Sequence, residues 1–168
     1  QRVLVRNLKV AAREDGVRCS IERHVGRIYL HPLEGATCAD LEALTARCRD
    51  IFGVATVSPC WVLPKGPRAV DFEEIVVMAN RVLDVALASL PRGEPLPTFR
   101  TSAQVTAQNF FKLNDMGATK LQCELAARLR LGERGLKVKL KNPGLTLTVE
   151  VRGEGTFCCA HSLRAVKG

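Results

Sequence analysis

The first 64 residues alternate between helical and extended patterns of apolar side chains. Residues 2–16 place apolar side chains every three to four positions and end at a glycine, which predicts a helix. Residues 17–23 and 26–31 alternate with a period of two and predict a β-hairpin. A second helical pattern over residues 37–53 starts at a threonine suited to cap a helix, and the valine-rich residues 54–64 predict a strand.

That order of helix, strand, strand, helix and strand is the order of a βαββαβ ferredoxin-like sandwich without its first strand. An unpaired sheet edge promotes aggregation, so we expect the missing strand upstream of Gln1. The predicted fold class is therefore α/β (α+β).

The rest of the chain predicts a second α/β unit, and we place the border in the loop at residues 64–70. Asp71 begins a long apolar helix that extends to about Leu90, and acidic residues in its first turn suit the positive end of the helix dipole. The proline-rich residues 91–97 stop that helix. Further periodic segments predict strands at 98–105, 136–142, 145–152 and 155–163, and a helix within 113–132. We expect these helices to cover one face of a sheet.

Positive charge is concentrated in the second part of the chain. The formal net charge is +8, and residues 1–91 hold 12 Lys/Arg and 11 Asp/Glu, whereas residues 92–168 hold 13 and 6. A net charge of +7 on the second part, against +1 on the first, is typical of a polyanion binder, although a solubilising surface is the simpler alternative. We therefore expect residues 71–168 to hold most of any affinity for RNA.

Several kinds of chemistry lack their signatures in this sequence. There is no Gly-Gly pair, no phosphate-binding glycine loop and no histidine or cysteine spacing suited to a metal, so we predict no cofactor and no metal. No segment is apolar enough to span a bilayer, and no signal-peptide pattern opens the chain. Seven scattered cysteines without CxxC spacing indicate reduced thiols in a cytoplasmic protein.

Three lysines occupy alternate positions in residues 136–142. In a strand, Lys137, Lys139 and Lys141 would share one face, while Val138 and Leu140 would share the other and enter a core. Three neighbouring ammonium groups repel one another, so the pattern favours phosphates lying across them. A solvated lysine face that protects a sheet edge is the alternative.

Other side chains could extend this positive surface or carry a different function. Arg100, Lys112 and Lys120 would contribute only if their elements converge on it, and Arg27 lies near Tyr29 on the hairpin. Adjacent strand residues point to opposite faces, so Cys158 and Cys159 predict one core thiol and one surface thiol. A sulfur carrier that uses either thiol is an alternative function, and it would require a reactive thiol.

Three stretches of the sequence resemble a known family. They are VRNLKVAAREDGVRCSIERHVGRIYL, DIFGVATVSPCWVL and LKVKLKNPGLTLTVEVR. Together they make nearly the whole chain, roughly residues 1–157, similar to the N-terminal ferredoxin-like domain and THUMP domain of the tRNA 4-thiouridine synthetase family. The resemblance assigns residues 1–66 to the first domain and residues 67–168 to the second.

The resemblance implies that the THUMP domain, helped by the ferredoxin-like domain, grips the tRNA acceptor stem and presents a distant uridine to a separate catalytic domain. Matched residue by residue, it supports RNA contacts at Arg27, Arg100, Lys139, Lys141 and Asn142. The sequence also departs from the family pattern at two positions. Lys139 stands where the family usually has an acid, and Lys112 is a displaced substitute for the basic residues that usually follow the first THUMP strand.

No Ser-Gly-Gly-x-Asp-Ser nucleotide loop and no sulfur-carrier domain occur in this sequence, so we expect no catalysis by the chain itself. It would be a fragment of a longer enzyme or an adaptor of one, with a separate catalytic subunit or domain as partner. We interpret it as a module that binds tRNA by shape and phosphate contacts, with no membrane contact. The alternative is a protein-interaction domain that forms a homodimer or docks an enzyme subunit. The residues expected at RNA are Arg27, Arg100, Lys112, Lys120, Lys137, Lys139, Lys141 and Asn142.

Overall fold

The computed structural model describes residues 2–24, 26–64, 70–90, 95–106, 117–160 and 163–164. The chain divides into two compact units, which we call the first unit (Gln1–Ser58 with Ser162–Gly168) and the second unit (Pro59–His161). These limits differ from the predicted border at residues 66/67, and the C-terminal residues belong to the first unit.

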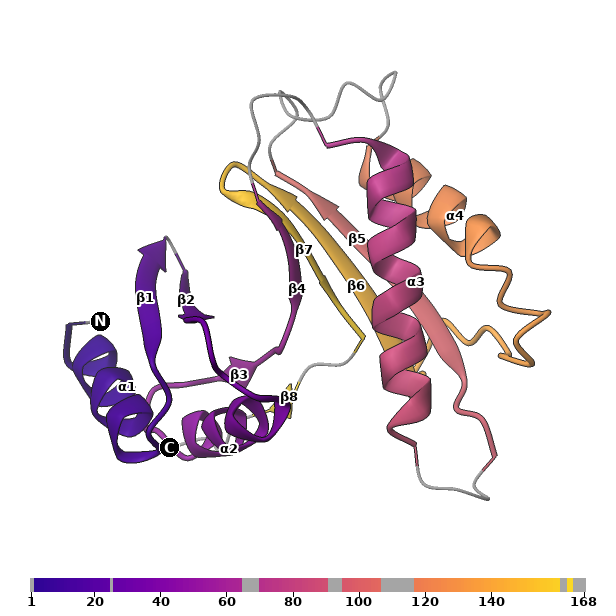
Figure 1. Cartoon of the computed structure of the whole chain (residues 1–168). Helices are drawn as coiled ribbons and strands as arrows, with labels where there is room; N and C mark the ends of the chain where they lie inside the picture. The colour runs from indigo at the N-terminus through magenta and orange to yellow at the C-terminus, as the bar shows by residue number, and fades with distance from the viewer. Residues whose placement is uncertain are drawn as a thin grey trace. The chain divides into compact units, whose positions relative to one another are not determined.

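The first unit packs two helices and a hairpin around a small core, in the predicted order. Its elements are α1 (Arg2–Glu14), β1 (Cys19–His24), β2 (Arg27–Pro32) and α2 (Cys38–Arg49) (Figure 1). The two hairpin strands pair antiparallel, with His24 opposite Arg27. Buried side chains from both helices and the intervening turn form the core, namely Leu8, Ala12, Val17, Leu44 and Cys48.

The second helix begins at the predicted cap. The Asp40 N–H donates to Thr37 Oγ1 at 3.2 Å, and the Thr37 N–H donates to the Asp40 carboxylate at 2.8 Å. These reciprocal hydrogen bonds form a capping box. The Thr37 backbone N–H, and then its hydroxyl, lower the pKa of the Asp40 carboxyl.

The prediction of one strand over residues 54–64 is wrong. β3 (Thr56–Val57) pairs with β8 (Leu163–Arg164) in the first unit, whereas β4 (Trp61–Pro64) pairs with β7 (Gly155–Cys159) in the second unit. Pro59 lies between them and has no N–H to donate, which interrupts a strand at that point. Among the described residues, the first unit therefore holds two separate strand pairs.

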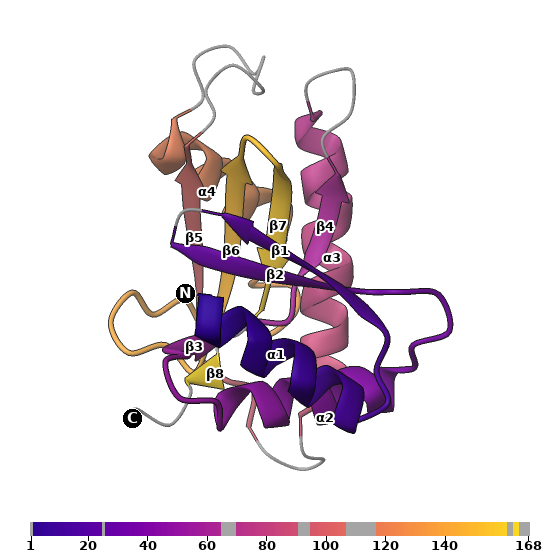
Figure 2. The same ribbon diagram turned by 90° about the vertical axis from the view of Figure 1, so that its left-hand side faces the viewer.

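The second unit is a four-stranded sheet with two helices on one face. The strand order is β4, β7, β6 (Leu145–Arg152) and β5 (Phe99–Val105), and only β5 and β6 run parallel. α4 (Ala118–Arg128) belongs to the crossover between these two strands, and α3 (Phe72–Ala88) precedes β5. Figure 2 shows both helices behind the strands, so the prediction that helices cover one face is confirmed.

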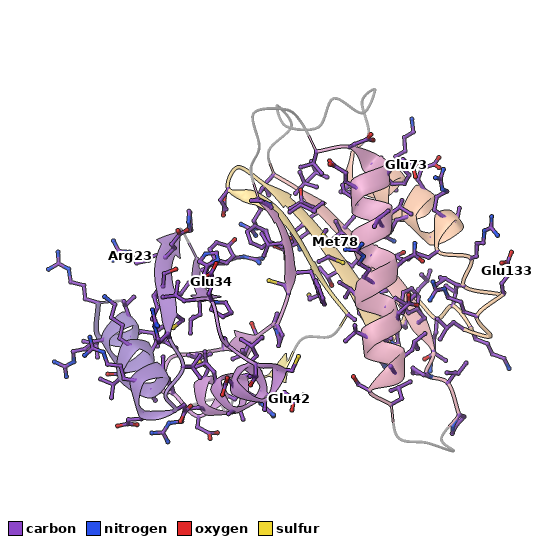
Figure 3. All side chains as sticks on the ribbon, viewed as in Figure 1. Arg23, Glu34, Glu42, Glu73, Met78 and Glu133 are labelled. Atoms are coloured by element: carbon purple, nitrogen blue, oxygen red, sulfur yellow. The ribbon has the colours of Figure 1, made fainter. Side chains whose placement is uncertain are left out.

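Alternation along β6 determines which side of the sheet is buried. Leu147 and Val149 are fully buried against the helices. On α3, Ile75, Ala79 and Leu83 recur every four residues, so they share one helix face, and each is fully buried. Met78, labelled in Figure 3, is buried in the same core. This core fixes β5 and β6, which carry the candidate site.

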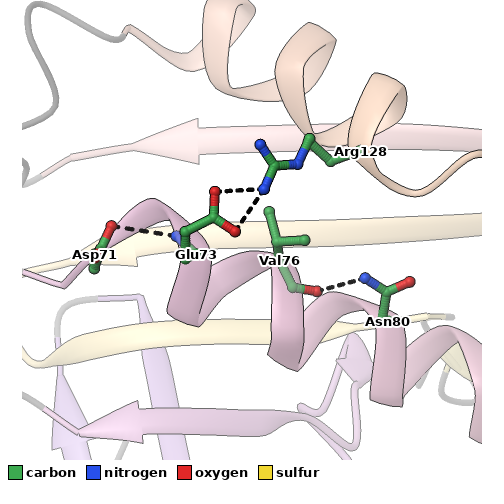
Figure 4. A network of polar contacts seen from close by, with 5 residues as sticks. All are labelled: Asp71, Glu73, Val76, Asn80 and Arg128. Atoms are coloured by element: carbon green, nitrogen blue, oxygen red, sulfur yellow. Dashed lines mark hydrogen bonds and ion pairs between the residues drawn. The ribbon is translucent and has the colours of Figure 1, made fainter.

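The cap of α3 provides a test of the fold. The Glu73 N–H donates to the Asp71 carboxylate at 3.3 Å (Figure 4). The Asp71 N–H donates to the Glu74 carboxylate at 3.1 Å. Asp71→Ala should lower the free energy of unfolding by about 1 kcal/mol, because it removes the N-cap acceptor. Asp71→Asn keeps an acceptor and should remain close to wild type. Urea unfolding measures both, and an Ala variant as stable as wild type would contradict this role of the cap.

Candidate functional site

The lysine segment, residues 137–141, is not the strand that its alternation predicts. Among the described residues, it forms a single β-bridge, from Val138 to Phe99 at the start of β5. Val138 and Leu140 are 62% and 66% exposed, so the prediction that they enter a core is wrong. The turn that follows redirects the chain after this one bridge, which explains why strand pairing does not continue. The whole segment therefore lies on the surface.

Three residues around the start of β5, Thr98, Phe99 and Arg100, form hydrogen bonds with the backbone of the lysine segment and of the following turn. The hydrogen bonds are Phe99 N–H to the Lys137 carbonyl (2.9 Å), Lys139 N–H to the Phe99 carbonyl (2.9 Å), Arg100 Nη1 to the Leu140 carbonyl (3.1 Å), Gly144 N–H to Thr98 Oγ1 (3.0 Å) and Leu145 N–H to the Thr98 carbonyl (2.8 Å). Backbone groups are held at both ends of the segment, so the lysine side chains extend from an ordered main chain.

The Asn-Pro-Gly turn has two positions with strict steric requirements. Asn142 has a φ of +49°, in the left-handed region that asparagine tolerates better than most residues. A Cβ atom on Gly144 would lie 2.9 Å from the Pro97 Cβ, so this position has no space for a side chain. The turn thus packs directly on the residues that lead into β5.

The lysines differ from the neighbouring arginines in their electrostatic partners. Four arginines of the second unit form ion pairs within it, and these are Arg128 with Glu73 (Figure 4), Arg130 with Glu133, Arg134 with Asp84, and Arg152 with Glu150. Lys137, Lys139 and Lys141 are exposed, and within the described part of the chain they form no ion pair. Their charge is available to a ligand.

Not all of the other residues predicted to contact RNA lie beside the lysine segment. Arg100 lies beside the lysine segment and binds its backbone. Lys120 is exposed in the first turn of α4, and Figures 1 and 2 show α4 near the far end of β5 from the lysine segment. Arg27 lies on β2 of the first unit, and Lys112 falls outside the described residues. The structure therefore joins Arg100 and Asn142 to the three lysines.

Thr98 is a site residue that sequence analysis missed. Its hydroxyl accepts a hydrogen bond from Gly144, 46 positions later, and no local pattern reports such a contact. The Asn-Pro-Gly sequence was the only available signal, because it predicts a turn that needs a backbone partner.

The cysteines have the environments expected for buried and surface thiols. Cys158 is fully buried and Cys159 is half-buried, which confirms the prediction of opposite faces. Burial, and then the nearby thiols Cys159 and Cys60, raise the pKa of Cys158 to about 12. Such a thiol stays protonated near neutral pH and is a poor nucleophile. In the described residues, which include all seven cysteines, no disulfide forms.

Two further searches of the described residues were negative. No group of three or more His, Cys, Asp and Glu side chains there is arranged to hold a metal ion. No helix in the same part of the chain is long and apolar enough to cross a membrane. The exposed lysine segment is thus the strongest candidate site that the described residues offer.

Comparison with known proteins identifies the second unit. Residues 69–158 match the THUMP domain. The chain belongs to the THUMP-domain family. THUMP domains are tRNA-binding modules of tRNA-modifying enzymes. The matched residues include the lysine segment and its anchors on β5.

Relatives of this THUMP protein include proteins named as probable tRNA sulfurtransferases. A probable tRNA sulfurtransferase of Natranaerobius thermophilus is 26% identical over 157 residues, which are 94% of this chain and 35% of that protein. The chain thus spans about a third of the length of that relative. The predicted resemblance to the THUMP-containing tRNA thiolation family is confirmed.

Solved structures share the fold. PH1313 from Pyrococcus horikoshii Ot3 matches with a TM-score of 0.74 and 18% identity, over 99% of this chain and 49% of that chain. A 4-thiouridine synthetase in complex with RNA and ATP matches with a TM-score of 0.66 and 22% identity, over 98% of this chain and 39% of that chain. The predicted α/β fold class is confirmed by these matches and by the observed elements.

The left-handed backbone at Asn142 gives a prediction for the turn. Asn142→Ala should lower the free energy of unfolding by about 1 kcal/mol, because alanine adopts a positive φ at a higher cost than asparagine. Asn142→Gly should stay within about 0.5 kcal/mol of wild type, since glycine accepts this φ freely. Thermal and urea unfolding measure the difference, and equal stability of the Ala and Gly variants would contradict the backbone explanation.

The buried thiols give a second prediction. With iodoacetamide at pH 8, exposed Cys38 and Cys123 should be alkylated in the folded protein, whereas Cys48 and Cys158 should react only after unfolding. Mass spectrometry of native and urea-treated samples reports each site. Fast native alkylation of Cys158 would overturn this assignment and favour the sulfur-carrier alternative.

Proposed function

We propose that the chain is the tRNA-binding part of a tRNA-modifying enzyme of the thiolation type, and that it grips the acceptor stem without catalysis of its own. The observation that carries the proposal is the lysine segment, with three exposed cations on a main chain held at β5, inside a domain of the THUMP family. The similarity to tRNA sulfurtransferases supports the thiolation class.

The geometry suits recognition of a phosphate backbone. A-form RNA hides the base edges of its deep major groove and offers phosphates and 2′-hydroxyls to a protein surface. Exposed ammonium groups bind phosphates as point charges and release counterions, which provides affinity without sequence information. Because the main chain is already ordered, little backbone entropy is lost when RNA binds.

Each predicted residue has a role in this proposal. Lys137, Lys139 and Lys141 contact phosphates, while Arg100 and Asn142 hold the segment in shape. Lys112, Lys120 and Arg27 add contacts outside the lysine segment.

Catalysis belongs to a different domain or subunit in this proposal. The chain spans about a third of its sulfurtransferase relative, and its sequence contains no nucleotide-binding glycine loop. No cofactor is therefore assigned to it, and the proposed place of action is the cytoplasm, where the substrate would be tRNA.

A protein-interaction or dimerisation domain is the second candidate. Large apolar side chains of the first unit favour it, since Phe52 is 77% exposed and Val3 is 67% exposed. An apolar contact of this kind would depend only weakly on salt, whereas phosphate contacts depend on it strongly. Sedimentation of the purified chain would detect a homodimer.

The lysine segment is tested by the salt dependence of tRNA binding. In Lys137→Gln/Lys139→Gln/Lys141→Gln, the slope of log affinity against log salt should shrink by roughly 0.7–0.9 per lysine. Each lysine that is removed leaves one phosphate unneutralised, and that phosphate then keeps its counterions when the protein binds. Fluorescence anisotropy with an unmodified tRNA transcript measures the slope. Arg81→Gln removes an exposed cation from α3 and should leave the slope unchanged.

A neutral variant separates the shape of the segment from its charge. Thr98→Val removes the acceptor of the Gly144 N–H and changes no charge, so it should weaken binding and keep the wild-type slope. A folded triple-lysine variant with the wild-type slope would contradict the proposal and favour the interaction domain.

A further inference from the structure

Three of the seven cysteines gather where β4 and β7 pair in the second unit (Figure 1). Trp61 pairs with Cys158 at the start of β4, and the next residues along the two strands are Cys60 and Cys159. Continued by one position, this antiparallel register places Cys60 opposite Cys159. Opposed residues of such a pair have Cα atoms about 4.5–5.5 Å apart, within the range of about 4.4–6.8 Å that a disulfide requires.

Strand alternation separates these two thiols from the third. Cys158 is fully buried in the core shared with α3 and α4, and its cross-strand partner Trp61 lines a hollow with Met78 of α3. Because neighbouring strand residues point to opposite faces, Cys60 and Cys159 both lie on the other face of the sheet. Cys60 is exposed and Cys159 is half-buried. The two thiols therefore share a face that small solutes can reach.

A second observation places the three sulfur atoms close together. Burial is the largest cause of the raised pKa of Cys158, and the thiols of Cys159 and Cys60 raise that pKa further. A neighbouring charge has such an effect within about 4–6 Å. Cys60 is far from Cys158 in the sequence, so the effect reports that the two strands bring their thiols together.

Cys60 and Cys159 also lie near both ends of the second unit. The chain enters this unit at Pro59 and leaves it after His161. A bond between residues 60 and 159 would therefore close most of the unit into one ring. β4 is an edge strand that pairs with β7 alone among the described residues, so the same bond would hold β4 on the sheet.

We propose that Cys60 and Cys159 form a redox-sensitive thiol pair, which hydroperoxides convert into a disulfide and small dithiols restore. The disulfide would join the entry and the exit of the second unit. This inference does not depend on the proposed function, because no RNA contact enters it.

Cys60 is the more exposed thiol of the pair, so it meets the peroxide first. Its thiolate attacks one oxygen of hydrogen peroxide, so that an S–O bond forms, the O–O bond breaks, and the leaving hydroxide takes up a proton to become water. The thiolate of Cys159 then attacks the sulfenic acid on Cys60. An S–S bond forms, the S–O bond breaks, and a second water leaves. The two sulfur atoms lose two electrons, and the peroxide gains them.

Peptide mapping of the whole chain after treatment with hydrogen peroxide tests the pairing. Trypsin releases residues 50–65, in which Cys60 is the one thiol, and residues 153–164, which contain Cys158 and Cys159. If remaining thiols are blocked with N-ethylmaleimide before digestion, mass spectrometry should find these two peptides joined, and dithiothreitol should separate them. Cys158→Ala should keep the link. Cys159→Ser should abolish it and leave a sulfenic acid on Cys60, which dimedone traps.

A second pair of neighbouring thiols provides the matched control. Burial, and then the nearby thiol of Cys19, raise the pKa of Cys48, but Cys48 is buried in the core of the first unit. Cys19 and Cys48 should therefore stay unlinked in the folded chain at the same peroxide concentration.

Thermal unfolding gives an independent readout of the disulfide. The oxidised wild type should melt on the order of 10 °C higher than the reduced protein, because the bond closes a ring of about 100 residues and so constrains the unfolded chain. Peroxide should not raise the melting temperature of Cys159→Ser, since this variant cannot form the ring.

Three results would reject the thiol pair. One is the absence of a link at a peroxide concentration at which dimedone labels Cys60. Another is a link that is lost in Cys158→Ala and kept in Cys159→Ser, because it would make Cys158 the partner. The last is a link that forms only between two chains, seen as a dimer on a non-reducing gel.

Discussion

The hydrogen bonds between the start of β5 and the lysine segment are the constraint on which the candidate site depends. Without them, residues 137–144 would be a charged loop with many conformations, and ordering it on a ligand would cost entropy. Phe99 is central, because its backbone N–H and carbonyl bind both sides of Val138 while its side chain is fully buried. The hydrophobic core and the lysine surface therefore share one residue.

The need to hold the lysine segment in place also explains why arginine and lysine have different roles in the second unit. Arginine supplies several directed donors, so Arg128 and Arg134 can tie α4 and the following loop to α3, and Arg100 can bind a backbone carbonyl. Lysine is a compact, strongly hydrated charge on a flexible stem and can remain at the surface. The structure thus separates cations that hold the segment in place from cations that remain exposed at the surface.

Local sequence predicted the parts of this fold that depend on local interactions. The cap at Thr37, the start of α3 at Asp71 and the alternation along β6 are visible in sequence, because they depend on residues only a few positions apart. The sequence did not show which strands pair with one another. Pro59 divides one valine-rich stretch between two units, and the alternation at residues 137–141 suits a strand but meets only one residue of β5. The anchors of that segment lie about 40 positions earlier, beyond the reach of any periodic pattern.

The central claim, that an ordered lysine segment meets the RNA backbone, is tested most directly by residue-resolved NMR of the 15N-labelled chain with an acceptor-stem RNA. The account predicts that amide shifts on titration concentrate at residues 137–142, and that the Gly144 and Leu145 amides exchange slowly with solvent both before and after RNA is added. Shifts confined to other surfaces, or rapid exchange of those two amides in the free protein, would contradict it.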